Sequence, residues 1–475
     1  MLSALEELGV GAGFATLVHV VLAGAATLHV LRHKREVGAA MAWIGVAWLS
    51  PVFGAIIYFA FGINRVRRRA RRLRGRRPLG GERAGARRVS PIPEYLESLD
   101  RAAGSVTDRP MLAGNRVDLL RNGDETYPPM IEAIDGARRS IALASYIFRD
   151  DPVGRKIIEA LIRAHERGVQ VRVLIDGVGG GYFSAPAWRR LKAGGVPAAL
   201  FLHTFVPWRM PFLNLRNHRK ILCVDGRVGF TGGINIGKEN MRDSDPERAV
   251  RDTHFRFEGP IVAQFVEAFA EDWFFTTGEE MDGDAWFPQL KAAGDVSARA
   301  VTSGPDEDYE KIELVVLHAI ACARRSIRIL TPYFLPHDGL ITALELAAMR
   351  GVQVDIILPS QTDLPVVDWA RRAQIRPLID ASGCQVFLTP PPFEHSKLMV
   401  IDEAWAMVGR ANWDARSFRL NFELNVEVRE VELVRQITEL IDRKRGPQLT
   451  GDQFERYPFL LELRDSAARL LLPYL

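Results

Sequence analysis

One short pattern occurs twice in this chain and limits its fold more than any other feature. Both copies read His-x-Lys, four residues, Asp, and later Gly-x-x-Asn. They comprise His218, Lys220, Asp225 and Asn235 in the first half and His395, Lys397, Asp402 and Asn412 in the second. One copy alone would fit a buried histidine beside a solvated lysine, but two copies with matching spacings predict a duplicated domain.

The residues around the first copy predict a β-hairpin. Residues two apart on a strand share a face, so His218 and Lys220 are expected to be neighbours. The apolar run that follows them ends at Asp225-Gly226, a dipeptide typical of tight turns. The chain then returns, which would bring Asn235 back beside the histidine and the lysine.

Further matches extend the duplication over most of the chain. Residues 137–148 match residues 323–334, and 167–171 match 350–354. Each half reads helix, buried strand, helix, buried strand and then the motif hairpin. This order predicts an α/β fold of two domains, each a mixed sheet with helices on both faces. We place them at residues 111–295 and 296–475, related by a pseudo-twofold axis with one shared site.

The repeated residue types suit substitution at a phosphodiester. That chemistry needs a nucleophile, an acid for the leaving oxygen and cations against the non-bridging oxygens. Two histidines and two lysines supply all of these without a metal or a cofactor. The three cysteines, Cys223, Cys322 and Cys384, are far apart and predict neither a disulfide framework nor a zinc site.

The N-terminal region predicts attachment to a membrane. Residues 9–31 and 37–61 are each long and apolar enough for a transmembrane helix, and together they define a membrane module at residues 1–64. Pro51 would kink the second helix, or the chain could re-enter the membrane there. Residues 65–110 read as a juxtamembrane segment and a linker; nine arginines in residues 65–77 place the following domains in the cytoplasm.

Charge is distributed unevenly along the chain. Residues 1–88 carry 15 Lys/Arg and 4 Asp/Glu, a net charge of +11, whereas the rest of the chain has a net charge of −7. The basic residues would attract anionic lipids next to the membrane module. An acidic catalytic part disfavours a nuclease and predicts no nucleic-acid partner.

The paired motif resembles that of the phospholipase D superfamily, over roughly residues 110 to 475. The resemblance implies that His218, Lys220, His395 and Lys397 are catalytic and that Asn235 and Asn412 line the phosphate pocket. Asp225 and Asp402 complete the motif's candidate catalytic set. Because both lie at the turn end of the hairpin, we expect a structural role for them.

Two further stretches resemble the bacterial cardiolipin synthases of this superfamily: Ala42 to Gly62 in the membrane module, and Asn412 to Glu423 after the second motif. This implies a multi-pass protein of the bacterial inner membrane that joins two phosphatidylglycerol molecules into cardiolipin through a phosphohistidine on His218. Hydrolysis by a phospholipase D, a membrane-tethered phosphodiesterase or nuclease, and an inactive adaptor stay as alternatives.

Other residues near the motifs have candidate roles. Asp252 and Glu423 follow the two motifs at corresponding positions, and each could orient a histidine through its second ring nitrogen. Arg410 departs from the subgroup, which usually has serine there; it could grip the second lipid's phosphate or pair with a carboxylate such as Asp414. The apolar loop 205–213 fits core packing or an acyl-chain lip.

Overall fold

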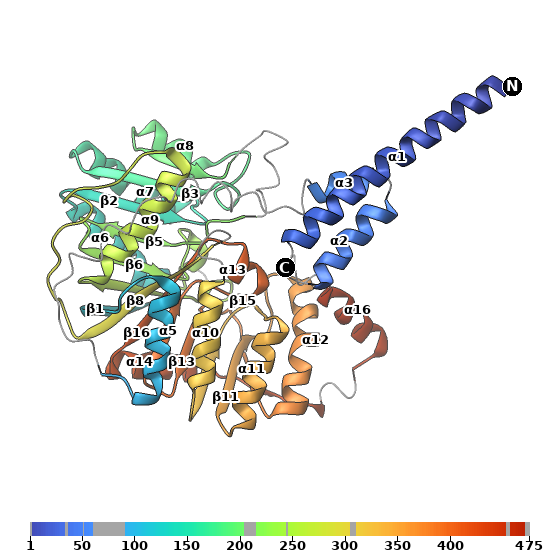
Figure 1. The fold of residues 1–475 in the computed structure, drawn as a ribbon. Coiled ribbons are helices and arrows are strands. Elements are labelled where there is room, and N and C mark those ends of the chain that lie inside the picture. The colour runs from blue at the N-terminus through green and yellow to red at the C-terminus, as the bar shows by residue number, and fades with distance from the viewer. Residues whose placement is uncertain are drawn as a thin grey trace. The chain divides into compact units, whose positions relative to one another are not determined.

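The computed structural model of the chain describes residues 2–33, 37–50, 52–59, 91–203, 215–243, 246–304, 310–452 and 457–470 (Figure 1). The arginine run at 65–77 and the apolar loop at 205–213 lie outside these ranges. The chain divides into two compact units, residues 1–69 with 204–214 and residues 70–203 with 215–475.

The membrane unit contains helices α1 (Leu2–His33), α2 (Val37–Leu49) and α3 (Phe53–Ile57). Within α1, Gly13–His33 is long and apolar enough to cross a membrane. The second predicted span, residues 37–61, contains a shorter helix, α2, followed by a break. Its first part, α2, has 13 residues and is therefore about 20 Å long, short of the roughly 30 Å hydrocarbon core.

The break in the second span falls beside Pro51, where the sequence predicted a kink or a re-entrant turn. Val52 has a positive φ of 62°. Gly54 then lies so close to the carbonyl of Val46 that no side chain would fit there. The Tyr58 hydroxyl bonds His29 Nδ1 at 2.7 Å, and the Tyr58 ring meets the Trp43 ring edge-on. The chain therefore folds back after α2, and α3 packs against both longer helices.

The larger unit is built on one continuous sheet whose two halves have the same strand order. The first half runs β1-β7-β6-β5-β2-β3-β4 and the second runs β8-β16-β14-β13-β9-β11-β12-β17, and antiparallel pairing of β1 with β8 joins them. The strands of the first half are β1 (Leu112–Arg121), β2 (Ser140–Ser145), β3 (Gln170–Asp176), β4 (Ala198–Phe201), β5 (Ile221–Val224), β6 (Val228–Gly232) and β7 (Thr253–Glu258).

The second half repeats this arrangement with one edge strand more. Its strands are β8 (Val296–Ser303), β9 (Ser326–Leu330), β11 (Gln353–Pro359), β12 (Gln385–Thr389), β13 (Leu398–Ile401), β14 (Trp405–Gly409), β16 (Glu423–Arg429) and β17 (Gln448–Leu449). A separate pair comprises β10 (Phe334–Leu335) and β15 (Trp413–Asp414). The matching order confirms the predicted duplication and the mixed α/β fold.

Helices cover both faces of the sheet, as the alternation of apolar residues along the strands requires. On β5 and β6, Leu222 and Phe230 join the core beneath α6 and α7, whereas Gly229 faces Phe265 of α9 on the other side. The helices of the two domains are α6 (Asn122–Gly136), α7 (Pro152–Glu166), α8 (Pro186–Ala193), α9 (Ile261–Thr277), α10 (Lys311–Cys322), α11 (Asp338–Met349), α12 (Pro365–Ser382), α13 (Ala415–Arg419), α14 (Val431–Arg443) and α16 (Phe459–Arg469), with short 3-10 turns at Glu94–Leu96 and Lys238–Asn240.

Part of the predicted linker is instead a helix of the catalytic unit. Helix α5 (Glu97–Thr107) buries Leu99 and Ala103 in the hydrophobic core of the second domain, beside α10 (Figure 1). Asp100 accepts hydrogen bonds from Arg299 at 2.6 Å and Arg429 at 2.7 Å, two arginines buried at the centre of the sheet. The segment before the first domain therefore belongs to the core of the second.

Candidate active site

The two motif hairpins form as the sequence predicts. Strands β5 and β6 are joined by a turn in which Asp225 and Gly226 have φ values of 53° and 61°. Strands β13 and β14 are joined in the same way, with Asp402 and Glu403 at 52° and 55°. Aspartate and glycine tolerate this left-handed region better than most residues. Both hairpins direct the histidine and the lysine to their open ends.

The motif aspartates hold backbone at the far end of each hairpin. Asp225 accepts hydrogen bonds from the amides of residues 138–140, at the start of β2. Asp402 does the same for residues 324–326, at the start of β9. Each carboxylate thus fastens a hairpin turn to the neighbouring strand. These are the contacts of a structural residue, and they lie at the opposite end of the strand from the histidine.

Backbone hydrogen bonds between the halves bring the two histidines into one site. The His218 amide donates to the carbonyl of Phe422 at 2.9 Å, and the His395 amide donates to the carbonyl of Arg251 at 2.7 Å. Each motif is therefore seated on the segment that follows the motif of the other half. These bonds join the two halves in addition to the antiparallel pairing of β1 with β8.

Each motif histidine contacts a carboxylate that comes from the other half of the chain. His218 Nδ1 lies 3.0 Å from Glu423 Oε1, and His395 Nδ1 lies 2.7 Å from Asp252 Oδ2. Both carboxylates are buried, and burial raises their pKa values. A proton on each Nδ1 satisfies the carboxylate, so Nε2 is the nitrogen left to react. The sequence predicted both carboxylates, but not that each one serves the histidine of the other half.

The two lysines lie beside their own histidines. Lys220 Nζ donates to the His218 carbonyl at 2.7 Å, and Lys397 makes the same bond to His395. Burial, followed by the nearby Arg410, lowers the pKa of both lysines well below the usual value. Burial and the adjacent lysine likewise lower the pKa of each histidine. The site therefore gathers two largely buried histidines, two buried lysines and the buried Arg410, and a bound anion would favour their charged forms.

The two asparagines have different surroundings. Asn235 Oδ1 accepts a hydrogen bond from the Ile147 amide at 3.3 Å. Asn412 is equally buried, but its Oδ1 has no hydrogen-bond partner among the described residues. Asn412 is therefore the member of the pair whose side chain is least constrained by the protein.

Arg410 lies behind His395 and bridges the two halves. Its Nη1 donates to the Gly233 carbonyl at 2.6 Å and lies 3.3 Å from His395 Nδ1. Asp414 does not pair with it, because that carboxylate caps α13 by accepting from the Ser417 amide. The guanidinium thus contacts the ring nitrogen that also faces Asp252, on the side away from Nε2.

Sequence reasoning missed two residues beside His218. The Tyr146 ring lies 4.2 Å from the His218 ring and 4.9 Å from Lys220 Nζ. Asn421 Nδ2 lies 3.2 Å from His218 Nδ1 and donates to Glu423. Tyr146 lies within residues 137–148, which match residues 323–334. Its place in this repeated stretch was the sequence feature that could have identified it as a site residue.

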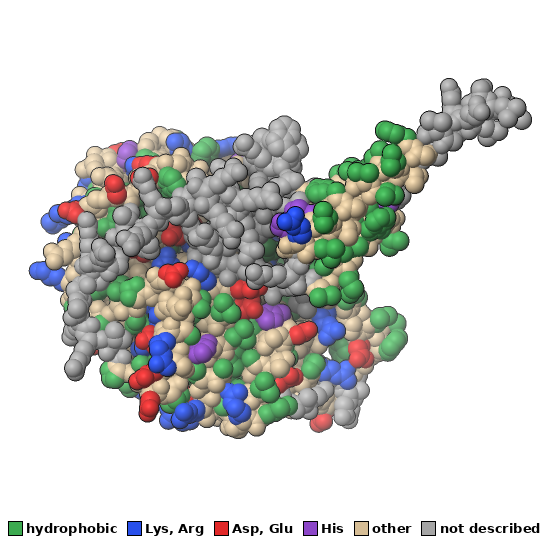
Figure 2. Space-filling model, viewed as in Figure 1, with side chains coloured by type: hydrophobic (Ala, Val, Ile, Leu, Met, Phe, Trp, Pro, Cys, Tyr) green, Lys and Arg blue, Asp and Glu red, His purple; other side chains and the backbone are tan. Residues whose placement is uncertain are grey.

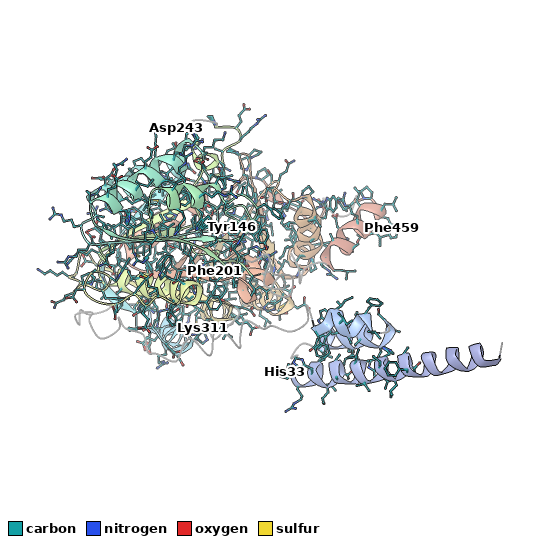
Figure 3. The ribbon with its side chains drawn as sticks, turned by 90° about the horizontal axis from the view of Figure 1, so that it is seen from above. His33, Tyr146, Phe201, Asp243, Lys311 and Phe459 are labelled. Atoms are coloured by element: carbon teal, nitrogen blue, oxygen red, sulfur yellow. The ribbon has the colours of Figure 1, made fainter. Side chains whose placement is uncertain are left out.

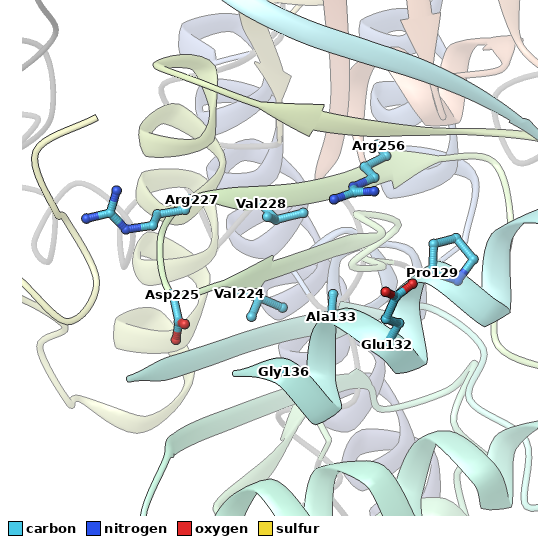
Figure 4. A pocket seen from close by; sticks show the side chains of 9 residues that line it. All are labelled: Pro129, Glu132, Ala133, Gly136, Val224, Asp225, Arg227, Val228 and Arg256. Atoms are coloured by element: carbon cyan, nitrogen blue, oxygen red, sulfur yellow. The ribbon is translucent and has the colours of Figure 1, made fainter. Parts of the chain in front are cut away.

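A shallow hollow at the turn end of the first hairpin is separate from this site. It is lined by residues of α6, of the β5–β6 hairpin and of β7, among them Glu132, Asp225 and Arg256, and by none of the four motif histidines and lysines (Figure 4). In the described part of the chain, no group of three or more His, Cys, Asp or Glu side chains is placed to hold a metal ion.

Comparison with known proteins places this chain in a family. The family described as "Cardiolipin synthase, PLD-like domain" matches residues 130–273 and 316–445, and the family described as "Phospholipase D-nuclease N-terminal" matches residues 21–62. The cardiolipin synthase of Geobacillus kaustophilus (strain HTA426) is 32% identical over 462 residues, 93% of this chain and 90% of that protein.

Two further comparisons agree. The major cardiolipin synthase ClsA of Bacillus subtilis (strain 168) is 32% identical over 477 residues, 95% of this chain and 96% of that protein. The crystal structure of phosphatidylserine synthase from Haemophilus influenzae Rd KW20 has the same fold, with a TM-score of 0.62 at 14% identity over 79% of this chain and 99% of that chain. The chain belongs to the cardiolipin synthases of the phospholipase D superfamily and is a phosphatidyltransferase.

Proposed function

We propose that this enzyme transfers a phosphatidyl group from one phosphatidylglycerol to another through a phosphohistidine, producing cardiolipin and glycerol. The observation that carries the proposal is the pair of exchanged contacts, His218 with Glu423 and His395 with Asp252. They leave two reactive Nε2 atoms in one pocket beside two lysines. One nitrogen can form a bond to phosphorus while the other moves a proton.

In the first step, His218 Nε2 attacks the phosphorus of the first phosphatidylglycerol. The P–N bond forms, the P–O bond to the headgroup glycerol breaks, and protonated His395 gives its proton to the leaving oxygen. The family resemblance assigns the attack to the N-terminal histidine. The buried Glu423 stabilises the positive charge that develops on the His218 ring.

In the second step, His395 Nε2 takes the proton from a headgroup hydroxyl of the second phosphatidylglycerol. That oxygen attacks phosphorus, and the P–N bond to His218 breaks. Atoms and protons balance, because His395 ends the cycle protonated as it began. In this proposal Lys220, Lys397 and the amides of Asn235 and Asn412 hold the non-bridging oxygens.

Bound phosphate also changes the protonation of the pocket. Burial lowers the pKa of the histidines and lysines in the free site. A phosphodiester anion among them favours their charged forms, so His395 becomes a proton donor when substrate is present. Because the protonation of His395 depends on a bound anion, it supports the proposal that the substrate is a negatively charged phosphodiester.

The proposal extends to location. We place the catalytic unit on the cytoplasmic side of the bacterial inner membrane, because nine arginines follow the membrane module in residues 65–77. Those arginines would also attract anionic lipids. We expect no nucleic-acid partner, since the chain outside residues 1–88 has a net charge of −7.

The test is to incubate the purified full-length protein in detergent with phosphatidylglycerol as the only lipid and to identify the products by mass spectrometry. Cardiolipin and glycerol in equal amounts are expected. Phosphatidic acid as the main product would show that water outcompetes the second lipid and would replace the proposal by hydrolysis. A His218→Asn/His395→Asn double variant is the control for copurified activity.

A further inference from the structure

The last described helix, α16 (Phe459–Arg469), has its apolar face turned away from the protein. It packs against α12, where Asp465 accepts a hydrogen bond from Arg372 at 2.8 Å. Ala468, buried like Asp465, joins a small cluster with Val367 and Ala370. The packed face of α16 therefore consists of a paired carboxylate and a small side chain.

The opposite face of α16 is apolar and exposed. The exposed fractions are 73% for Phe459, 74% for Leu460, 56% for Leu463 and 76% for Leu470, which directly follows the helix. At about 100° per residue, these four lie within roughly one third of the helix circumference, whereas Asp465 and Ala468 lie opposite. Phe459 lies at the rim of the molecule in Figure 3, and apolar atoms gather there in Figure 2.

This arrangement is the reverse of an ordinary surface helix, which turns its apolar stripe to the core. Exposed apolar side chains at helical spacing cost about 25 cal/mol for each Å² left in water. A contiguous stripe of this kind marks a contact surface. The sequence continues the same character beyond Leu470 as Leu-Leu-Pro-Tyr-Leu.

Basic and aromatic side chains close to α16 suit a lipid occupant. Arg464 stacks on the Trp369 ring at 4.5 Å, and Arg372, which pairs with Asp465 on the packed side of α16, lies 6.0 Å from the Tyr457 ring. The two packed helices, α12 and α16, together carry five arginines (371, 372, 376, 464 and 469) and four acids (Asp368, Asp380, Glu462 and Asp465), a net charge of +1. Arginines and amphipathic aromatic rings beside an apolar stripe suit an anionic membrane surface.

The cluster on which α16 packs is close to the active site. Tyr333 packs against the cluster that holds Ala468, and its ring lies 6.2 Å from the His395 ring. The packed face of α16, opposite the stripe, is therefore one side chain removed from His395. An enzyme whose substrates are membrane lipids gains from contact at this place.

We propose that α16 is a second membrane contact of this enzyme, in addition to α1, with Phe459, Leu460, Leu463 and Leu470 inserted among the lipids at the bilayer interface. The contact orients the catalytic unit on the membrane that carries its substrates. It rests on the family's lipid substrates and is independent of the phosphohistidine route.

The test uses full-length protein reconstituted into vesicles of phosphatidylglycerol and phosphatidylethanolamine. Cys322, which is partly exposed, is replaced by serine, while Cys223 and Cys384 are buried. An environment-sensitive fluorophore is attached to Leu463→Cys or Leu460→Cys. The matched control is Val431→Cys on α14, an exposed apolar position outside the stripe (78%).

Lipids with brominated acyl chains are expected to quench the labels at 460 and 463 at least threefold more than the label at 431. A label at 463 that is shielded from water but not quenched would show that protein covers the stripe, either a second copy or the chain's own C-terminal residues, and would overturn the proposal. A label that stays in water, or equal quenching at 431 and 463, would overturn it as well. Because the readout is fluorescence, failure here leaves the proposed reaction untouched.

Discussion

Arg410 and Gly233 occupy the same position in the two halves of the chain, and they are hydrogen-bonded to each other, Nη1 to carbonyl oxygen, at 2.6 Å. The contact requires a residue without a side chain at position 233. A Cβ on Gly233 would collide with the carboxylate of Asp252, which already occupies that space. The arginine therefore breaks the pseudo-twofold symmetry and puts an additional cation beside His395, whereas the amide of Asn421 occupies the comparable place beside His218.

Replacing Arg410 by serine should destabilise the protein without weakening acceptor binding. The Gly233 carbonyl would lose a buried, charge-assisted hydrogen bond, which costs about 1.5–3 kcal/mol of unfolding free energy. The KM for the acceptor lipid should change less than about twofold, because the guanidinium lies on the Nδ1 side of His395. Unfolding in detergent and steady-state kinetics measure these quantities.

The control for Arg410→Ser is Arg163→Ser, whose ion pair with Asp135 is exposed. Arg163→Ser should lower the free energy of unfolding by less than about 1 kcal/mol. A large rise in acceptor KM for Arg410→Ser with unchanged stability would support direct contact with the second lipid's phosphate.

The two histidines should differ when the leaving group is already acidic. His218→Asn should abolish phosphoenzyme formation with every substrate, because it removes the nucleophile. His395→Asn should still be labelled by an activated aryl phosphodiester, since loss of a general acid, about 10²- to 10⁴-fold, matters less there. Labelling of His218→Asn alone would reverse the assignment.

The exchanged carboxylates predict a crossed pattern of defects. Glu423→Gln should slow phosphoenzyme formation from the aryl phosphodiester by about 10²-fold or more, because Glu423 supports His218. Asp252→Asn should largely spare that step and slow turnover of phosphatidylglycerol, which needs proton transfer by His395. Rapid-quench labelling separates the two. If Asp252→Asn, rather than Glu423→Gln, blocked labelling, the pairing of carboxylates with catalytic roles would be wrong.

Asp100 should be required for stability although it precedes both domains. Asp100→Ala leaves the buried Arg299 and Arg429 without a shared acceptor, at a cost of about 2 kcal/mol or more. Asp108→Asn, which removes an exposed charge at the end of α5 and keeps a side chain that tolerates the left-handed backbone there (φ 55°), should cost less than about 0.5 kcal/mol. Removal of residues 1–77 should accordingly leave a folded enzyme, whereas removal of residues 1–107 should not. Thermal unfolding of the four proteins measures both comparisons.

His254 should make the protein sensitive to acid. Burial lowers the pKa of His254 to about 3, so below pH 6.5 the unfolded chain takes up a proton that the folded chain does not. Stability therefore falls as the pH falls, by about 2 kcal/mol for this group between pH 7 and pH 5. The variant His254→Asn carries the residue found at the equivalent position, Asn425. Its free energy of unfolding should fall by about 2 kcal/mol less than that of the unchanged protein between pH 7 and pH 5. Identical pH dependence of unfolding in the two proteins would show that His254 is not neutral in the fold.

Local patterns in the sequence determined the duplication, the two hairpins and the four catalytic candidates. These features depend on strand periodicity, turn residues and spacing, all of which are read within a few residues. His218 and Lys220 are neighbours because they are two apart in an extended segment, whatever surrounds them. Asp225 was placed at the turn end for the same reason, which is why a structural role could be expected for it.

Tertiary structure alone decided which groups meet across the chain. Asp252 contacts His395 and Glu423 contacts His218 because each motif packs on the segment that follows the motif of the other half. Helix α5 joins the second domain because Arg299 and Arg429 need its carboxylate, and α2 ends early because the chain folds back at Gly54. Sequence spacing carries no information on such contacts, since buried charges and close backbone approaches find their partners only when distant segments pack.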